Sequence, residues 1–223
     1  MKLSINLNKI ALLRNARGEN YPDLKYFAKK AIDLGVDGLT LHPRPDHRHA
    51  TSHDVIELSK LARDEGVEFN IEGNPFSKPY NEFLGFCELV QMIIPDQITL
   101  VPDTINQITS DHGWSPGSHD EDLKKIIQLL KEKSKNSKIS LFIDDMNGVK
   151  YAAEMNADLI EMHTGKFSNS INNGDISILN EVQEIIDSAL NHNLLINAGH
   201  DLNLTNLHYL VEMGNINEVS IGH

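Results

Sequence analysis

Four ionisable side chains lie at or near the ends of short apolar runs in this sequence: His42, Glu72, Glu161 and His200. Imidazole can release or take up a proton near neutral pH. A carboxylate that is partly shielded from water becomes a stronger base than one in solution. The four side chains therefore predict acid–base catalysis, provided that the fold brings the ends of these runs together.

Basic side chains follow the second of these runs, in the segment 42–49, which reads HPRPDHRH. Guanidinium groups such as that of Arg44 form paired hydrogen bonds with phosphate oxygens, so the segment, which ends at His49, suits a phosphorylated ligand. A solvated charged loop is one alternative. A metal site is another, but structural zinc usually needs four well-spaced ligands, and we expect no metal. The segment LLRNARG (12–18), expected as a loop, adds Arg17.

Short apolar runs alternate with longer amphipathic segments along the whole chain. The strand-like runs are LSINL (3–7), GLTLH (38–42), EFNIEG (68–73), QITLVP (97–102), KISLFID (138–144), LIEMHTG (159–165), LLINAGH (194–200) and EVSIGH (218–223). The clearest helical segments are 22–35, 52–66, 121–135 and 176–192. Strands separated by helices pair in parallel, and eight such units in 223 residues predict an α/β fold, a (β/α)₈ TIM barrel, as one domain over residues 1–223. A doubly wound sheet is less consistent with the sequence, because no G-x-G-x-x-G follows the first run.

In such a barrel the C-terminal ends of the strands converge on one site, which would unite the four ionisable residues. Gly222, at the end of the last run, is placed for the phosphate cradle that barrels build after their last strands. Two polar segments, 110–122 and 166–175, are expected as loops at the same face. The sequence ends at His223, so the helix that would cover the eighth strand is expected to be absent from this chain.

The charge of the chain limits its partners. There are 20 basic and 32 acidic residues, giving a formal net charge of −12, which argues against non-specific nucleic-acid binding. The single cysteine, Cys87, cannot form an intrachain disulfide, which fits a reducing compartment. No apolar stretch approaches the length of a membrane span, and no signal peptide is evident. We therefore expect a cytoplasmic protein without membrane or nucleic-acid partners.

Several segments, in order from Ile5 to His223, resemble those of the pyridoxine 5′-phosphate synthase family: INLNKIALLRNARG, GVDGLTLHPRPDHRH, FNIEG, LVPD, SLFID, LIEMHTG, INAGHDL and VSIGH. The combination of RNARG, HTG, NAGH and IGH at strand ends is highly specific. The resemblance implies a TIM barrel with added helices that assembles as a homo-octamer. It also implies condensation of 3-amino-2-oxopropyl phosphate with 1-deoxy-D-xylulose 5-phosphate to pyridoxine 5′-phosphate, phosphate and water, without an organic cofactor.

The resemblance also implies roles for individual residues. His42 and Glu72 match the first and second proton acceptors, His200 matches the proton donor, and Glu161 matches the carboxylate that stabilises the transition state. The residues that match contacts to the amino-ketone phosphate are Asn6, Arg17, Gly222 and His223, and Asp201, directly after His200, matches a further substrate-binding position whose backbone N–H points at a phosphate. Those that match contacts to the deoxyxylulose phosphate are Asn8, Lys9, Arg44, His49 and Thr109.

The chain departs from the family pattern at two points in the expected site. Asn8 and Lys9 stand where the family usually has Asp-His, so a carboxylate and an imidazole become an amide and a cation. Asp201 stands where glycine is usual, and its carboxylate beside a phosphate dianion is unfavourable. These two departures therefore affect how tightly the substrates bind more than which reaction is catalysed.

Two other functions remain open on the sequence. A phosphosugar isomerase or aldolase barrel would share the base-and-phosphate layout, but it needs a Schiff-base lysine or metal ligands at strand ends, which are not evident. A catalytically impaired barrel, retained as a phosphometabolite-binding protein, would explain the changes at Asn8, Lys9 and Asp201. All four expected catalytic groups are nevertheless present.

Overall fold

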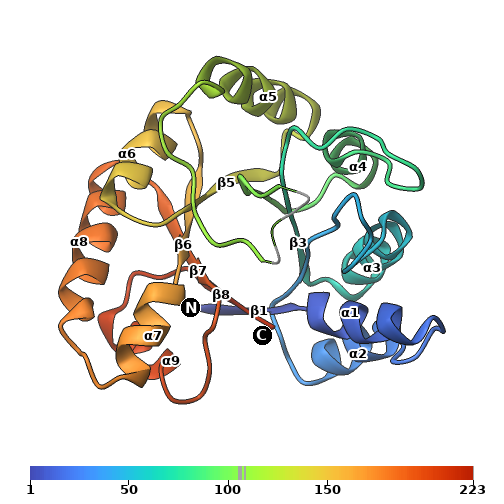
Figure 1. The fold of residues 1–223 in the computed structure, drawn as a ribbon, viewed down its shortest axis with the longest axis horizontal. Coiled ribbons are helices and arrows are strands. Elements are labelled where there is room, and N and C mark those ends of the chain that lie inside the picture. Colours follow the sequence, from blue (N-terminus) through green and yellow to red (C-terminus); the bar gives the residue numbers. More distant parts are fainter. Residues whose placement is uncertain (105–106, 108, 223) are drawn as a thin grey trace.

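Eight parallel strands form a closed barrel inside a ring of helices (Figure 1) in the computed structural model, which describes residues 1–104, 107 and 109–222. The strands are β1 (Lys2–Asn6), β2 (Gly38–Leu41), β3 (Glu68–Gly73), β4 (Gln97–Leu100), β5 (Lys138–Ile143), β6 (Leu159–His163), β7 (Leu195–Gly199) and β8 (Glu218–Ile221). Each strand pairs with the next along the chain, and β8 pairs with β1. The predicted (β/α)₈ barrel is confirmed, and β8 is the last element of the described part of the chain.

The helices connect successive strands on the outside of the barrel (Figure 1). They are α1 (Asn8–Arg17), α2 (Leu24–Asp33), α3 (Ser52–Glu65), α4 (Phe86–Ile93), α5 (Asp120–Lys133), α6 (Met146–Glu154), α7 (Gly165–Asn172), α8 (Ile178–Asn191) and α9 (Leu207–Met213). The connections from β1 to β2 and from β6 to β7 each contain two helices. Within the described residues, no helix combines the length and apolar character needed to cross a bilayer.

Two segments expected as loops are helical. The segment 12–18 lies mostly in α1, whose buried face carries Arg14 while Leu13 is 58% exposed. The Arg14 guanidinium donates to both carboxylate oxygens of Asp54 at 2.6 and 2.7 Å, so an ion pair and not an apolar side chain fills this part of the buried helix face. The segment 166–175 forms most of α7, where burial of Phe167 overrides the low helix propensity of its serine and asparagine residues.

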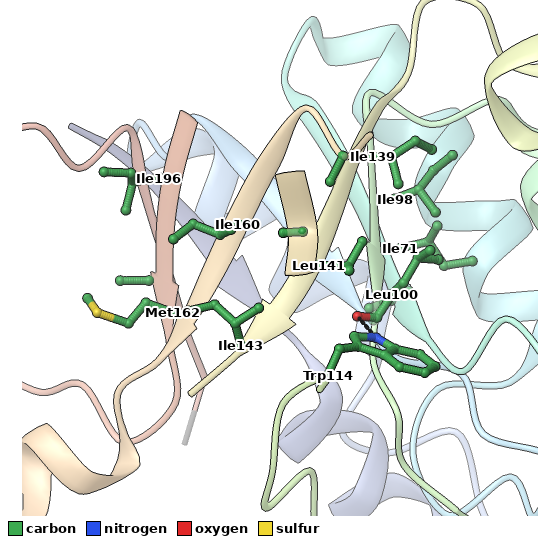
Figure 2. Close-up of a cluster of buried hydrophobic side chains, with 14 of the residues drawn as sticks. Ile71, Ile98, Leu100, Trp114, Ile139, Leu141, Ile143, Ile160, Met162 and Ile196 are labelled. Atoms are coloured by element: carbon green, nitrogen blue, oxygen red, sulfur yellow. Dashed lines mark hydrogen bonds between the residues drawn. The ribbon is translucent and has the colours of Figure 1, made fainter. Parts of the chain in front are cut away.

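The outer face of the barrel is apolar and packs beneath the helices. Figure 2 shows this layer, with isoleucine and leucine side chains from β3 to β7 that are fully buried. The Trp114 indole closes one end of the layer and donates a hydrogen bond from Nε1 to the Leu100 carbonyl at 2.8 Å. Each large aliphatic side chain buried in this way stabilises the fold by about 1.5–3 kcal/mol.

The interior of the barrel is polar instead of being filled by branched aliphatic residues. Gln97 of β4 donates from Nε2 to Glu218 of β8 at 3.1 Å, and Asn197 of β7 donates to the Gln97 side-chain oxygen at 2.8 Å. Because β4 is not a neighbour of β7 or β8 in the sheet, these side chains meet across the interior. Alternate strand residues thus point into a polar core, which continues to the C-terminal ends of the strands.

Candidate active site

A cavity of about 230 Å³ opens where the C-terminal ends of the strands meet. Its lining contains all four predicted acid–base residues, from four different parts of the chain. The lining residues are Asn6, Asn8, Lys9, His42, Arg44, His49, Glu72, Val101, Thr109, Ser110, Phe142, Glu161, His200, Asp201, Leu202, Ser220, Ile221 and Gly222. The fold therefore brings together every predicted site residue except Arg17, which does not line the cavity, and His223, which lies outside the described residues.

His42 and Glu72 face each other on neighbouring strand ends. The His42 Nδ1 atom lies 3.8 Å from Oε2 of Glu72, and the Asn6 side-chain amide donates to the same oxygen at 3.3 Å. The side-chain oxygen of Asn8 accepts a hydrogen bond from the His42 backbone at 2.9 Å. The end of β1 and the start of α1 thus hold the two proposed proton acceptors in place.

Two of the carboxyl groups that line the cavity, those of Glu72 and Glu161, hold their protons more tightly than carboxyls in water. Burial raises the pKa of Glu72 well above its ordinary value, and the nearby charges of Glu161 and Asp103 raise it further. Burial and then the charge of Glu218 raise the pKa of Glu161 to about 7. Because close carboxyl groups do not readily ionise together, this pair can hold or release a proton near neutral pH.

His200 lies across the cavity in an unusual backbone conformation, with φ of +90°. Its Nε2 atom is 3.1 Å from the Thr109 hydroxyl, and its Nδ1 atom is 2.9 Å from the Asp201 carboxylate. The His163 ring packs edge-on against it at 4.8 Å between centroids. The Thr164 hydroxyl donates to the His200 carbonyl at 2.5 Å, so both ring and backbone are fixed, as a proton donor requires.

Cationic and hydrogen-bonding groups suited to phosphate surround the same cavity. Arg44 is only 3% exposed, and its Nη1 atom donates to the Gln107 carbonyl at 2.8 Å. Burial, reinforced by the charges of His42 and Arg44, lowers the pKa of His49 to about 4, so its ring is neutral at pH 7. A Cβ at Gly222 would lie 2.2 Å from the Asn6 carbonyl oxygen, so only glycine fits where β8 approaches β1.

Among the residues that the structure describes, no group of three histidine, cysteine or acidic side chains is arranged to hold a metal ion. The expectation of a metal-free reaction stays a prediction. Lys9, near the start of α1, is among the residues that line the cavity.

Residues 3–223 match the family model described as "Pyridoxal phosphate biosynthesis protein PdxJ". The chain belongs to the PdxJ family. Curated relatives agree along the whole chain: the pyridoxine 5′-phosphate synthase of Xanthomonas axonopodis pv. citri (strain 306) is 43% identical over 225 residues, spanning 100% of this chain and 88% of the relative. That of Xylella fastidiosa (strain M23) is 44% identical over 225 residues, spanning 100% of this chain and 86% of the relative.

Solved structures share the PdxJ-family chain's fold at low identity. The thiamine phosphate pyrophosphorylase of Pyrococcus furiosus superposes with a TM-score of 0.62 at 12% identity, covering 99% of this chain and 85% of its own. The HpcH/HpaI aldolase of Desulfitobacterium hafniense gives 0.60 at 12% identity, with 100% and 86% covered. At this identity the likeness concerns the barrel alone.

The two departures from the PdxJ pattern have different structural settings. Asn8 begins α1, and its side-chain oxygen accepts the hydrogen bond from the His42 backbone N–H at 2.9 Å, so the amide still takes part in organising the site. Asp201 has φ of +58°, in the left-handed region that glycine adopts without cost. An aspartate tolerates this conformation better than most residues, which accounts for its presence at a glycine position.

One buried acid of this PdxJ-family site was not predicted. Asp103 follows β4 in the sequence VPD and contacts both His42 and Arg44. Two features of the sequence marked its position: it stands just beyond the strand-like run QITLVP (97–102), and it belongs to the segment LVPD that resembles the family.

Proposed function

We propose that this chain is a pyridoxine 5′-phosphate synthase. It would condense 3-amino-2-oxopropyl phosphate with 1-deoxy-D-xylulose 5-phosphate, yielding pyridoxine 5′-phosphate, phosphate and water. The observation that carries this proposal is the convergence of His42, Glu72, Glu161 and His200 on one cavity beside Arg44. Membership of the PdxJ family and the names of the curated relatives support the same reaction.

The reaction requires several proton transfers on different faces of its intermediate. Joining an amine to a ketone and closing a pyridine ring removes protons from carbon and expels water and phosphate. We assign His42 as the first proton acceptor, Glu72 as the second, and His200 as the donor. Glu161 would stabilise the transition state. Groups on several strand ends meet this need because each can act from its own side of the cavity.

Two phosphorylated substrates must be held together in the same cavity. Arg44, His49 and Thr109, with Asn8 and Lys9, would bind the deoxyxylulose phosphate. Asn6, Gly222 and the backbone N–H of Asp201, together with Arg17 and His223, would bind the amino-ketone phosphate. Holding two dianions in fixed positions turns a bimolecular encounter into a positioned reaction.

A turnover assay with both substrates tests the proposal. Purified protein incubated with the two phosphates should release pyridoxine 5′-phosphate, detected by mass spectrometry, and inorganic phosphate in equal amounts. Omission of either substrate should abolish both products. Tight binding of either substrate without product would instead favour the catalytically impaired phosphometabolite-binding barrel.

The assembly and compartment of the chain follow from the same proposal. We expect a cytoplasmic homo-octamer, with no nucleic-acid or membrane partner. Light scattering coupled to size-exclusion chromatography at micromolar concentration would test the octamer, and a monomer would contradict it.

A further inference from the structure

The Asp103 carboxylate is buried among groups assigned to catalysis, although it does not line the cavity itself. Asp103 is 6% exposed and lies beyond the end of β4. The backbone around it stays joined to β3, because the Val101 N–H donates to the Gly73 carbonyl at 2.9 Å. The Asn74 side chain donates to the Asp103 carbonyl at 2.6 Å. The carboxylate is therefore held by the sheet and not by a free loop.

One oxygen of this carboxylate contacts two basic side chains, those of His42 and Arg44. Oδ2 of Asp103 lies 3.1 Å from Nε2 of His42 and 2.5 Å from Nη2 of Arg44. The opposite nitrogen of His42, Nδ1, faces Glu72 at 3.8 Å. The charged or titratable groups around His42 are thus Glu72 from β3, Asp103 after β4, and Arg44 and His49 from the segment after β2.

The charge state of Asp103 suits a fixed electrostatic partner. Burial opposes the ionisation of Asp103. The charge of His42, the hydrogen bond with its ring and the charge of Arg44 together outweigh the effect of burial, so the pKa of Asp103 falls below its usual range. The carboxylate is therefore ionised at neutral pH. Removing it would leave the buried Arg44 guanidinium without its acidic partner, which is costly in a desolvated site.

We propose that Asp103 is a positioning residue of the condensation reaction, holding the His42 ring through Nε2 and orienting the Arg44 guanidinium toward a substrate phosphate. A carboxylate at Nε2 favours the tautomer that carries its proton there, which leaves the Nδ1 lone pair facing Glu72 and the cavity. Nδ1 is then the atom of His42 that accepts the substrate proton. This inference rests on the proposed function, because it assigns Asp103 to the same site.

The Asp103→Asn variant tests the role with little change of shape. We expect kcat to fall at least about 10- to 100-fold, the loss usual for a carboxylate that orients a functional imidazole from behind. The acid limb of the kcat–pH profile should move to lower pH by about 1 unit, because the negative charge that favours a protonated imidazole is gone. The KM for the deoxyxylulose phosphate should rise a few-fold through Arg44, while that for the amino-ketone phosphate stays within about twofold.

Two further variants separate positioning from general stability. Asp103→Glu restores the charge and should recover part of kcat and the wild-type acid limb. Asp158→Asn makes the same chemical change in an ion pair with Lys131 (2.7 Å) on a different segment, and should leave both quantities unchanged. An Asp103→Asn enzyme with an unmoved acid limb, whatever its kcat, would overturn the positioning role.

An NMR measurement of the histidine rings keeps this test independent of turnover. In substrate-free protein at a pH where the ring is neutral, the ring-nitrogen chemical shifts of His42 should report the tautomer protonated at Nε2, and this tautomer should be less populated in Asp103→Asn but not in Asp158→Asn. An unchanged tautomer population in Asp103→Asn would overturn the inference. If the wild type makes no pyridoxine 5′-phosphate but the tautomer population changes, the contact with His42 stands and the proposed function fails.

Discussion

Glu72 and Glu161 share one buried cavity, and each changes what the other can do. Burial and the charge of Glu161 raise the pKa of Glu72, so its carboxylate is a stronger base than an exposed one, although less of it is ionised at neutral pH. Asn6 donates to it at 3.3 Å and partly opposes this shift. The pKa of Glu72, the second proposed proton acceptor, therefore depends on its surroundings and not on its residue type alone.

Glu72→Gln keeps the shape of this side chain and removes its ability to take a proton. We expect kcat to fall at least about 100-fold, as for loss of a general base. The melting temperature should not fall, because a neutral amide is less costly to bury than an ionised carboxylate. Steady-state kinetics and thermal unfolding of the variant measure both effects, with Glu184→Gln on the exposed face of α8 as the matched control. Turnover near the wild-type rate would show that Glu72 is not a catalytic base.

Asp201 combines a backbone cost with an electrostatic one. Its φ of +58° suits glycine, and its carboxylate lies 2.9 Å from His200 beside the proposed amino-ketone phosphate site. We expect Asp201→Gly to lower the KM for the amino-ketone phosphate several-fold, because a negative charge beside a dianion is removed.

The companion variant Asp201→Ala distinguishes the two costs. It also removes the carboxylate, so the same decrease in KM is expected, but it keeps a Cβ at positive φ and should be less stable than Asp201→Gly by about 1 kcal/mol. Kinetics and denaturant unfolding of both variants would measure these differences. A KM that rises in both variants would mean that the Asp201 side chain assists substrate binding.

At the scale of the elements, the strands follow from the sequence more directly than the helices do. EFNIEG is observed as β3 over the expected residues 68–73, and each other expected strand is found within two residues of its bounds. Apolar residues under the helices alternate with polar residues such as Asn70 and Glu72. This period of two distinguishes the strands from helices and gives the barrel its polar interior.

The segments that could not be predicted lack such a period. Arg14 is buried in α1 only because Asp54, 40 residues later, supplies its partner. Likewise, α7 exposes Lys166, Asn169 and Asn172 and depends on burial of Phe167. Asp103 was missed for the same reason, since its contacts with His42 and Arg44 require the end of β4 to lie beside the segment after β2. Long-range pairing of polar groups leaves no local pattern in a sequence.

The ends of β1 and β8 meet so closely that a single methyl group should disturb the site. A Cβ on Gly222 would lie 2.2 Å from the Asn6 carbonyl oxygen and 2.8 Å from the Asn6 Cβ. We expect Gly222→Ala to push β8 from β1, lowering kcat/KM at least about tenfold and stability by about 1–3 kcal/mol.

Gly117→Ala is the matched control for this variant. A Cβ there would meet only the Ser115 carbonyl oxygen, at 3.9 Å, which is an ordinary contact. It should leave kcat/KM and the free energy of unfolding within experimental error of the wild type. Equal behaviour of the two alanine variants would contradict close packing at Gly222.

At the scale of the whole molecule, the polar interior links stability to pH. Glu218 is 3% exposed, and burial, followed by the charge of Glu68, raises its pKa to about 7 from an ordinary value of 4.5. The folded chain therefore binds this proton more tightly than the unfolded chain does. The resulting stabilisation is fully present below about pH 4.5 and is lost as the pH rises through about 7.

Glu218→Gln removes this titration and keeps an oxygen for the hydrogen bond from Gln97, which is 3.1 Å long in the wild type. The variant cannot acquire a buried charge. Its free energy of unfolding, relative to that of the wild type, should therefore rise between pH 5 and pH 8, by at most about 3 kcal/mol. At pH 5 it should be no more stable than the wild type, because the buried Oε2 atom of Glu218 has no hydrogen-bond partner for an introduced N–H. Urea unfolding at four pH values would measure this change, with Glu184→Gln again expected to give a difference that does not vary with pH. A constant difference between Glu218→Gln and the wild type would mean that Glu218 remains ionised in the folded barrel throughout this range.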